Sequence, residues 1–194
     1  MSKIIKRGLF HIFGGISIVV AALYLPRLAL LISVCVATLI FLSFELMRFR
    51  VSVVNRWFLS NFSSLLREEE TSRFTGTSYM LVASLIAFLT FDRDIAILAL
   101  SFLAVGDAMG TIVGTLIGKR RLLRKTLEGD LACLLSCTVI GLIFYYIGFG
   151  VPLLTILAGA VSAAIIEAIG LPINDNLTIP IIAGLIMTLI PIYP

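Results

Sequence analysis

Residues 106–130 read GDAMGTIVGTLIGKRRLLRKTLEGD, which places an acid inside an apolar span and a dense basic run directly after it. The acid is Asp107, and an ionisable side chain at membrane depth is costly, so such residues are candidate functional groups whose charge needs a partner. The cations that follow suit a phosphate-bearing ligand, and they are Lys119, Arg120, Arg121, Arg124 and Lys125. This pattern predicts an active site that opens toward one side of a membrane.

The composition places the whole chain among integral membrane proteins. Of its 194 residues, 60% are hydrophobic and 13% are charged, and the mean hydropathy is +1.12. Because a transmembrane helix needs about 20 mostly apolar residues, Pro, Gly and charge clusters divide the chain into about seven candidate spans. These are residues 8–25, 28–47, 76–91, 95–117, 131–149, 152–170 and 177–192. We therefore expect an all-α membrane helix bundle in which residues 1–194 form a single domain.

The distribution of Lys and Arg predicts the orientation, because these residues concentrate in short cytoplasmic loops. With a cytoplasmic N-terminus, all of them except Arg27 and Arg93 lie on the cytoplasmic side. The formal net charge of +4 then reflects loop asymmetry, and no nucleic-acid partner is expected. A secretory signal is the alternative reading of the N-terminus, but His11 and the Gly-Gly pair at 14–15 are unusual in a signal core. We expect an integral protein of the cell membrane whose active site faces the cytoplasm.

This orientation gathers most polar residues at one end of the bundle. At or near the predicted cytoplasmic ends lie Arg7, His11, Glu45, Arg73, Lys119, Glu128, Asn174 and Asp175. Glu167 lies about two helical turns before Asn174 and is a candidate to join them from the membrane side. The acidic run at 68–70 is interpreted as a solvated loop face. The predicted outer loops are very short, so we expect one cytoplasm-facing cluster.

Glycines recur at every fourth position around the central acid, namely at Gly106, Gly110, Gly114 and Gly118. On a continuous helix they form a small-residue stripe that suits close packing against a neighbouring helix and permits pairing between copies. Asp107 and Lys119 lie 12 residues apart, or about 18 Å along an ideal helix, which is too far for both to hold adjacent phosphate oxygens. If both serve one site, the helix must break, and the expected place is 110–118, where freed N–H groups could hold phosphate.

The polar residues also fall into short motifs that run nearly the length of the chain. The central ones are Gly106-Asp107-Ala108, Gly114, Gly118-Lys119 and Lys125-Thr126-Leu127-Glu128-Gly129. The outer ones are Arg7-x-x-x-His11-x-x-Gly14, Glu45-x-x-Arg48, Arg73-x-x-Gly76-x-x-Tyr79 and Asp-Asn-Leu-Thr-Ile-Pro at 175–180. Their order and type resemble the motifs of the CTP-dependent lipid-alcohol kinases, which include dolichol kinase, phytol kinase and the CTP-dependent diacylglycerol kinase. The chain resembles a minimal prokaryotic-type member without the additional N-terminal spans of the larger eukaryotic dolichol kinases.

That resemblance implies transfer of the γ-phosphoryl group of CTP to a membrane-embedded lipid alcohol, such as a polyprenol, phytol or diacylglycerol. It implies Mg²⁺ as cofactor, because the charge on the transferring group must be neutralised. Asp107 and Asp175 would hold the metal, or one of them would be the base that receives the hydroxyl proton. CTP, the lipid alcohol and membrane lipids are thus the expected partners.

The resemblance also implies roles for the residues around the phosphates. The catalytic candidates are Asp107, Asp175, Glu128 and His11. The candidate nucleotide-binding residues are Gly106, Gly110, Gly114, Gly118, Lys119, Lys125, Thr126, Arg73 and Asn176. Lys119 and Lys125 would neutralise phosphate charge, and Thr126 would donate to a phosphate oxygen or a metal-bound water. Glu128 would orient Lys125 or bind a second metal.

Each role has a structural alternative. Asp107 is also explained by a salt bridge inside the bundle, and His11 by a hydrogen bond near the membrane interface. Topology and contact with anionic lipid are the favoured explanation of three cations, Arg120, Arg121 and Arg124. The run Asn-Asp-Asn at 174–176 also fits a turn between two spans.

Two other classes of function remain open. A phosphatidate cytidylyltransferase also uses CTP and Mg²⁺ at a membrane, but it makes a CDP-lipid, and the carboxyl-terminal Asp-Arg-x-x-Asp signature associated with that family is absent. A small transporter would also have short spans with polar residues and glycines at depth. The grouping of the polar residues toward one side, rather than along a path, favours an enzyme.

Overall fold

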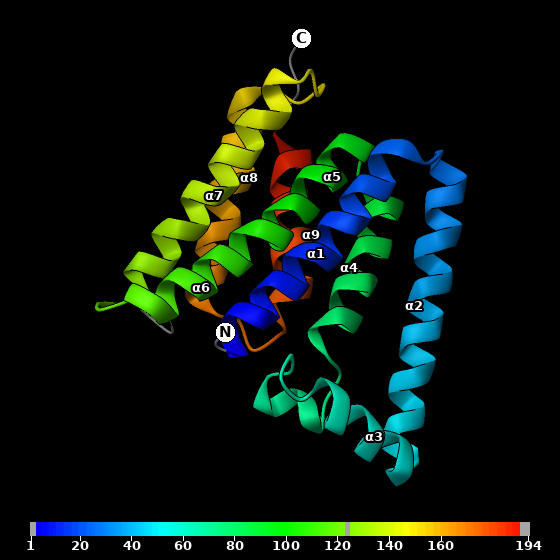
Figure 1. Cartoon of the computed structure of the whole chain (residues 1–194). Coiled ribbons are helices and arrows are strands. Elements are labelled where there is room, and N and C mark those ends of the chain that lie inside the picture. Colours follow the sequence, from blue (N-terminus) through cyan, green and yellow to red (C-terminus); the bar gives the residue numbers. More distant parts are fainter. Residues whose placement is uncertain (1–2, 123–124, 191–194) are drawn as a thin grey trace.

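The computed structural model describes residues 3–122 and 125–190, which form a helical bundle with one short hairpin (Figure 1). The elements in chain order are α1 (Lys3–Tyr24), α2 (Arg27–Arg50), α3 (Ser52–Phe62), η1 (Glu68–Thr71), α4 (Gly76–Thr90), α5 (Arg93–Ser101), η2 (Phe102–Asp107), α6 (Ala108–Ile117), β1 (Arg121–Leu122), β2 (Lys125–Thr126), α7 (Leu127–Tyr146), α8 (Leu153–Ile169) and α9 (Asp175–Leu189). Apart from the hairpin, the predicted all-α class is correct for this part of the chain. Arg124 lies outside the described residues.

Each of the seven predicted spans coincides with one helical segment. Four segments are long and apolar enough to cross a membrane, and they are Lys3–Tyr24, Arg27–Arg50, Arg93–Ile117 and Leu127–Tyr146. Three further apolar helices are shorter, namely Gly76–Thr90, Leu153–Ile169 and Asp175–Leu189. Large hydrophobic side chains such as Leu39, Leu135 and Leu154 are exposed on the outside of the bundle. The protein is thus an all-helical bundle with four candidate membrane-spanning helices.

The continuous segment formed by α5, η2 and α6 is the centre of the bundle. In the apolar stretch of this segment, 78% of the residues are buried. In Figure 1 the segment runs between α7 and α8 on one side and α1 and α4 on the other. The buried alanines Ala96, Ala99, Ala104, Ala160 and Ala163 line these contacts. Small residues let helix backbones approach closely, which is how helices pack when lipid removes the hydrophobic drive between them.

Helix α2 lies at the edge of the bundle and packs mainly on α4, while α3 leaves its end at an angle (Figure 1). Helix α3 is absent from the seven predicted segments, because its 11 residues are too few to span a membrane. Its Phe58 is buried and Trp57 is 55% exposed. At the opposite end of the bundle, the guanidinium of Arg93 donates to the carbonyls of Ala22 and Leu25 at the end of α1.

A π-helix, η2, interrupts the central segment directly before and at Asp107. Such a wide turn frees backbone carbonyls for other donors and is frequent at functional sites. The thiol of Cys137 donates to the carbonyl of Phe102 across 3.7 Å, and His11 hydrogen-bonds to the backbone of Leu103. The irregular turn therefore ties α1 and α7 to the central segment beside the acid.

The helix break expected within 110–118 occurs only at the last residue of that range, because α6 is regular from Ala108 to Ile117. The chain leaves the helix only at Gly118, which has an extended backbone. Lys119 therefore lies at the exposed far end of α6, away from Asp107. The irregularity that the site needs occurs in η2 instead, on the other side of the predicted range.

The glycine stripe packs closely, as one reading of the sequence predicted. A Cβ atom on Gly110 would lie 2.7 Å from Oε1 of Glu167 on α8, and one on Gly114 would lie 2.8 Å from Oγ1 of Thr126. Both distances are too short for a real Cβ. From α7, a Cβ on Gly129 would lie 2.8 Å from the carbonyl oxygen of Gly110. These glycines let α6 approach α7 and α8, whereas their predicted role in nucleotide binding stays a prediction.

Candidate functional site

Lys125 lies at the centre of a cluster of carboxylates drawn from three separate helices. Its Nζ is 2.8 Å from Oε1 of Glu167, 3.3 Å from Oδ2 of Asp175 and 3.6 Å from Oδ1 of Asp107. The Lys125 side chain is 25% exposed, whereas that of Glu167 is 0% exposed. The candidate residues Asp107, Lys125 and Asp175 therefore meet, and Glu167 joins them from α8 as the sequence suggested.

The carboxylates keep Lys125 charged. Burial by itself lowers the pKa of this ammonium, but the negative charges of Asp107, Glu167 and Asp175 outweigh burial, and the hydrogen bond to Glu167 adds to their effect. The pKa of Lys125 is therefore raised above its usual value. At neutral pH the side chain is a fixed positive charge that neutralises part of the negative charge of the three surrounding carboxylates.

The hairpin after α6 carries Lys125 back toward the bundle. Strands β1 and β2 are antiparallel, with Leu122 paired to Lys125, and the N–H of Leu127 donates to the carbonyl of Arg120 at 2.9 Å. Thr126 is the N-cap of α7 and accepts from the N–H of Gly129 at 3.3 Å. Its hydroxyl hydrogen remains available to a ligand. The Lys-Thr-x-Glu-Gly motif thus forms the second strand of the hairpin and the start of α7.

Glu128 contacts the loop backbone rather than Lys125. Its carboxylate accepts from the N–H of Lys119 at 3.1 Å and from the N–H of Arg120 at 3.3 Å. The prediction that Glu128 orients Lys125 directly is therefore wrong, because Glu167 and Asp175 hold the ammonium. Glu128 and Lys119 together fasten the hairpin to the end of α6. Lys119 is exposed, and its predicted contact with the same phosphates as Asp107 lacks the helix break it required.

His11 lies beside Asp107 and comes from the N-terminal half of α1. Nε2 of His11 is 3.9 Å from Oδ2 of Asp107. In the described part of the chain, neither Nε2 of His11 nor Oδ1 of Asp107 has a hydrogen-bond partner, and both atoms are buried. Buried polar atoms that lack a hydrogen bond are costly. This pair is therefore available to a ligand hydroxyl or to a transferred proton.

An apolar cavity of about 280 Å³ reaches this pair. Six aromatic side chains line it, namely Phe10, Phe41, Phe44, Trp57, Phe58 and Phe62. Its polar lining includes His11, Asp107, Arg67 and Asn176. The cavity therefore joins an aromatic wall, built largely from α2 and α3, to the ionisable residues of the cluster.

A second cavity, of about 330 Å³, is polar and is lined in part by Lys125. Its lining includes Arg67, Arg73, Lys125, Asn174 and Asp175. The side chain of Asn174 caps α9 by accepting from the N–H of Asn176 at 3.0 Å. The turn that the Asn-Asp-Asn run suggested is therefore present, and it also aims Asp175 at Lys125.

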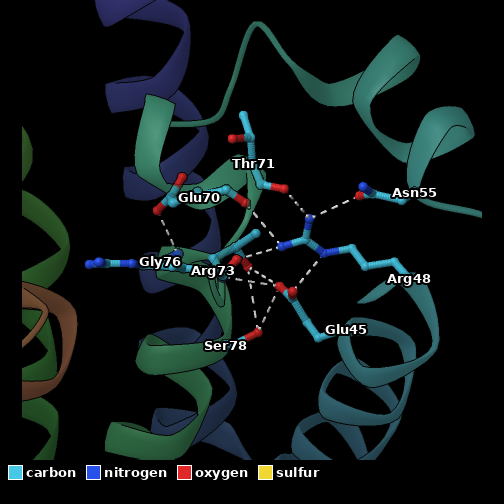
Figure 2. Close-up of polar contacts among 9 residues, drawn as sticks. Glu45, Arg48, Asn55, Glu70, Thr71, Arg73, Gly76 and Ser78 are labelled. Atoms are coloured by element: carbon cyan, nitrogen blue, oxygen red, sulfur yellow. Dashed lines mark hydrogen bonds and ion pairs between the residues drawn. The ribbon is translucent and has the colours of Figure 1, made fainter. Parts of the chain in front are cut away.

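A buried ion pair on α2 holds the loop between the two cavities (Figure 2). Nε of Arg48 donates to Oε2 of Glu45 at 2.7 Å, and both side chains are at most 1% exposed. Nη2 of Arg48 donates to the carbonyls of Glu70 at 3.0 Å and Arg73 at 2.6 Å. Oε1 of Glu45 accepts from the hydroxyl of Thr75 at 2.6 Å. Helix α2 thus clamps the chain from Glu70 to Thr75.

The buried side chain of Glu70 also holds this loop. Its carboxylate accepts from the N–H of Gly76 at 2.7 Å and from the N–H of Arg67 at 2.8 Å, and the residue is 6% exposed. The interpretation of 68–70 as a solvated face is therefore wrong for Glu70, although Glu68 and Glu69 are exposed. Charge pattern alone could not separate the three neighbouring acids.

The cluster offers hard oxygen donors but no ready-made metal cage. Among residues 3–122 and 125–190, no group of three or more His, Cys, Asp or Glu side chains is arranged to hold a metal ion. Asp107 and Asp175 nevertheless both approach the same Nζ, and Oδ1 of Asp107 lacks a hydrogen bond within this part of the chain. Mg²⁺ commonly takes one or two carboxylates and completes its shell with water and substrate phosphates. The residues therefore fit a metal brought in with a phosphate ligand.

Two residues near the cluster were absent from the predicted site. Arg67 lines both cavities, but it belongs to none of the recognised motifs. Asp130 is 8% exposed, and both of its carboxylate oxygens lack hydrogen bonds in the described residues. Asp130 directly follows the Lys-Thr-x-Glu-Gly motif, so its position could have pointed to the site.

Comparison with known proteins gives one relative of nearly the same length. The chain is 27% identical over 192 residues to the uncharacterized protein RP860 of Rickettsia prowazekii (strain Madrid E). The alignment covers 96% of this chain and 94% of that relative. No family model matches the chain, and no solved structure matches it. The comparison therefore shows sequence similarity over nearly the whole of both chains and assigns no activity.

Proposed function

We propose that this protein transfers the γ-phosphoryl group of CTP to the hydroxyl of a membrane-embedded lipid alcohol. The observation that carries the proposal is the meeting of a polar cavity and an aromatic cavity at one cluster of ionisable residues. Lys125 lines the polar cavity and lies 3.6 Å from Asp107, which lines the aromatic one. A kinase for a lipid needs this arrangement, because its donor is anionic and its acceptor is apolar except for one hydroxyl.

The aromatic cavity is the proposed acceptor site. Its wall of phenylalanine and tryptophan side chains suits an alkyl or isoprenoid chain, and its polar end holds His11 and Asp107. A lipid hydroxyl at that end would meet Nε2 of His11 and Oδ1 of Asp107, two buried atoms with no other hydrogen-bond partner in the described chain. Either atom can receive the hydroxyl proton, while the cavity wall excludes water from the transfer.

The polar cavity is the proposed donor site. Arg73 and Lys125 line it and supply positive charge for the phosphates. Thr126 lies next to Lys125, and its hydroxyl could donate to a phosphate oxygen. Asp107 and Asp175 would hold Mg²⁺ together with the phosphates of the donor. When bound, the metal neutralises phosphate charge. Lys125, already placed between these two acids, would then shift toward the phosphate oxygens that replace its carboxylate partners.

We further propose that all seven apolar segments cross the membrane with the N-terminus in the cytoplasm. The ionisable cluster joins the N-terminal half of α1 and the start of α9 at one end of the bundle. Single cysteines at Asn61 and Tyr146, introduced after replacement of the native cysteines, test this with a membrane-impermeant maleimide. We expect Asn61→Cys to react only from the cytoplasmic side and Tyr146→Cys only from the outside. The reverse pattern would contradict the orientation.

The activity is tested with CTP labelled in either its γ- or its α-phosphate, offered to the purified protein in lipid with Mg²⁺ and a panel of lipid alcohols plus phosphatidate. Label entering lipid only from the γ-position is the expected result and identifies the acceptor. Label entering only from the α-position would instead make the protein a cytidylyltransferase. Absence of label from both positions would favour the transporter.

The matched variants are Asp107→Asn and Asp94→Asn. Asp94 lies at the other end of the same central segment, where it accepts from the N–H of Gly150 at 3.2 Å. We expect Asp107→Asn to abolish transfer and Asp94→Asn to retain it. Full transfer by a correctly folded Asp107→Asn protein would remove Asp107 from the mechanism.

A further inference from the structure

Arg67 occupies the boundary between the two cavities. It lines the aromatic cavity and the polar cavity, and it also lines an open groove together with Lys3 and Arg7 at the start of α1. Its charge acts on Asp107 and Asp175, the two acids that face Lys125. Arg67 therefore lies where a group passing from the polar cavity to the aromatic one would have to be held.

The guanidinium of Arg67 is only weakly engaged. Its ion pair within the described residues is with Glu69, with NH1 3.9 Å from Oε1, and the Glu69 side chain is 56% exposed. The Arg67 side chain is 26% exposed, and a long contact to an exposed carboxylate contributes little, because water screens it. An incoming anion can therefore replace Glu69 at small cost.

The backbone of Arg67, by contrast, is held firmly. Its N–H donates to Oε2 of Glu70 at 2.8 Å, and its carbonyl accepts from the N–H of Glu70 at 3.1 Å. The other oxygen of Glu70 is bonded to the N–H of Gly76 at the start of α4. Arg48 of α2 then fixes the carbonyl of Glu70, as Figure 2 shows. The backbone of Arg67 is thus fixed, whereas its guanidinium is only weakly paired.

We propose that Arg67 binds the phosphate chain of the nucleotide at the junction of the two cavities. The proposal rests on the proposed function for the identity of the nucleotide. A guanidinium presents donors in a planar fork that matches two phosphate oxygens, which a lysine ammonium cannot do. Glu70, Glu45 and Arg48 act as positioning residues for Arg67, since they hold the loop that carries it.

Equilibrium binding tests this without requiring turnover. The full-length protein in nanodiscs with Mg²⁺ is titrated with CTP, ATP and inorganic pyrophosphate, using wild type, Arg67→Gln, Arg67→Lys and the control Arg56→Gln. Arg56 is an exposed arginine on α3 that lines neither cavity. We expect Arg67→Gln to weaken binding by about tenfold to a hundredfold, as loss of a charge-assisted hydrogen bond does. The affinity of Arg67→Lys should lie between those of wild type and Arg67→Gln. Arg56→Gln should bind as tightly as wild type.

The outcomes separate the two proposals. If wild type binds CTP and both Arg67 variants bind it equally well, the role of Arg67 is overturned and the proposed function stands. If wild type binds pyrophosphate but neither nucleotide, the proposed donor is wrong, and the effect of Arg67 is read from pyrophosphate. If wild type binds none of the three probes, both proposals fail. Should Arg67→Gln not fold, the comparison of wild type with Arg67→Lys decides.

Discussion

Nζ of Lys125 lies 2.8 Å from Oε1 of Glu167, which joins the hairpin after α6 to a fully buried carboxylate on α8. Glu167 is in turn covered by Gly110, where a Cβ would lie 2.7 Å from the same oxygen. The position of the lysine therefore depends on a glycine in α6, the helix that directly precedes the hairpin. A buried charge of this kind is tolerated only with a partner.

Removal of the ammonium should therefore destabilise the protein as well as inactivate it. We expect Lys125→Met to lower the free energy of unfolding by about 3–5 kcal/mol, because it leaves Glu167, Asp107 and Asp175 without their shared cation. Denaturant titration in detergent micelles measures this. The double variant Lys125→Met/Glu167→Gln should recover part of the stability and none of the phosphoryl transfer. Equal stability of the single and double variants would mean that the ion pair does not hold the hairpin.

Addition of one methyl group at Gly110 should act on the same pair. In Gly110→Ala the new Cβ displaces the Glu167 carboxylate, and overpacking of this kind costs about 1–3 kcal/mol. The matched control is Gly150→Ala, whose Cβ would meet only Oδ2 of Asp94, at an ordinary 3.6 Å. Thermal unfolding of both variants checks this, together with phosphoryl transfer. We expect a lower Tm and reduced transfer for Gly110→Ala and not for Gly150→Ala. Wild-type stability and transfer in Gly110→Ala would show that α6 can move away from α8.

The sequence predicted the spans and most of the cluster because both leave periodic or compositional traces. Long apolar runs between charged loops identified the seven apolar helical segments, and charge sorting placed Lys125 and Asp175 at one end. Asp107 was identified separately, as an acid inside an apolar span. Helix α3 escaped because it is too short to span a membrane. Lys119 was paired with Asp107 through a helix break that α6 lacks, since spacing along a helix cannot reveal a hairpin that returns Lys125 instead.

The loop between the cavities was the least predictable part of the site. Glu68, Glu69 and Glu70 are chemically alike and adjacent, and only the tertiary contacts with Arg67 and Gly76 show that Glu70 is buried. The π-helical turn at Asp107 likewise has no characteristic sequence pattern that would predict it. It depends on side chains from other helices that satisfy its carbonyls.

The clamp on α2 should contribute to stability well beyond an ordinary ion pair. We expect Arg48→Met to cost about 3–5 kcal/mol of unfolding free energy, because Glu45 is left charged and buried and several loop carbonyls lose their donor. Arg50→Met is the control, since Arg50 is exposed two residues further along the same helix. Unfolding in detergent measures both. A cost for Arg48→Met as small as that for Arg50→Met would contradict the clamp.

The aromatic cavity makes a prediction about the acceptor alone. Thr111 lines that cavity on α6, whereas Thr115, one turn further along, is exposed and lines neither cavity. Thr111→Phe should fill part of the space and raise the KM for the lipid alcohol about tenfold or more, the scale of a few lost methylene contacts, while CTP binding stays unchanged. Thr115→Phe should leave both quantities at wild-type values, since Thr115 lies one turn beyond the residues that line the cavity. The measurement is transfer rate against acceptor concentration at saturating CTP. If Thr111→Phe weakened CTP binding and left the acceptor KM unchanged, the assignment of the two cavities would have to be exchanged.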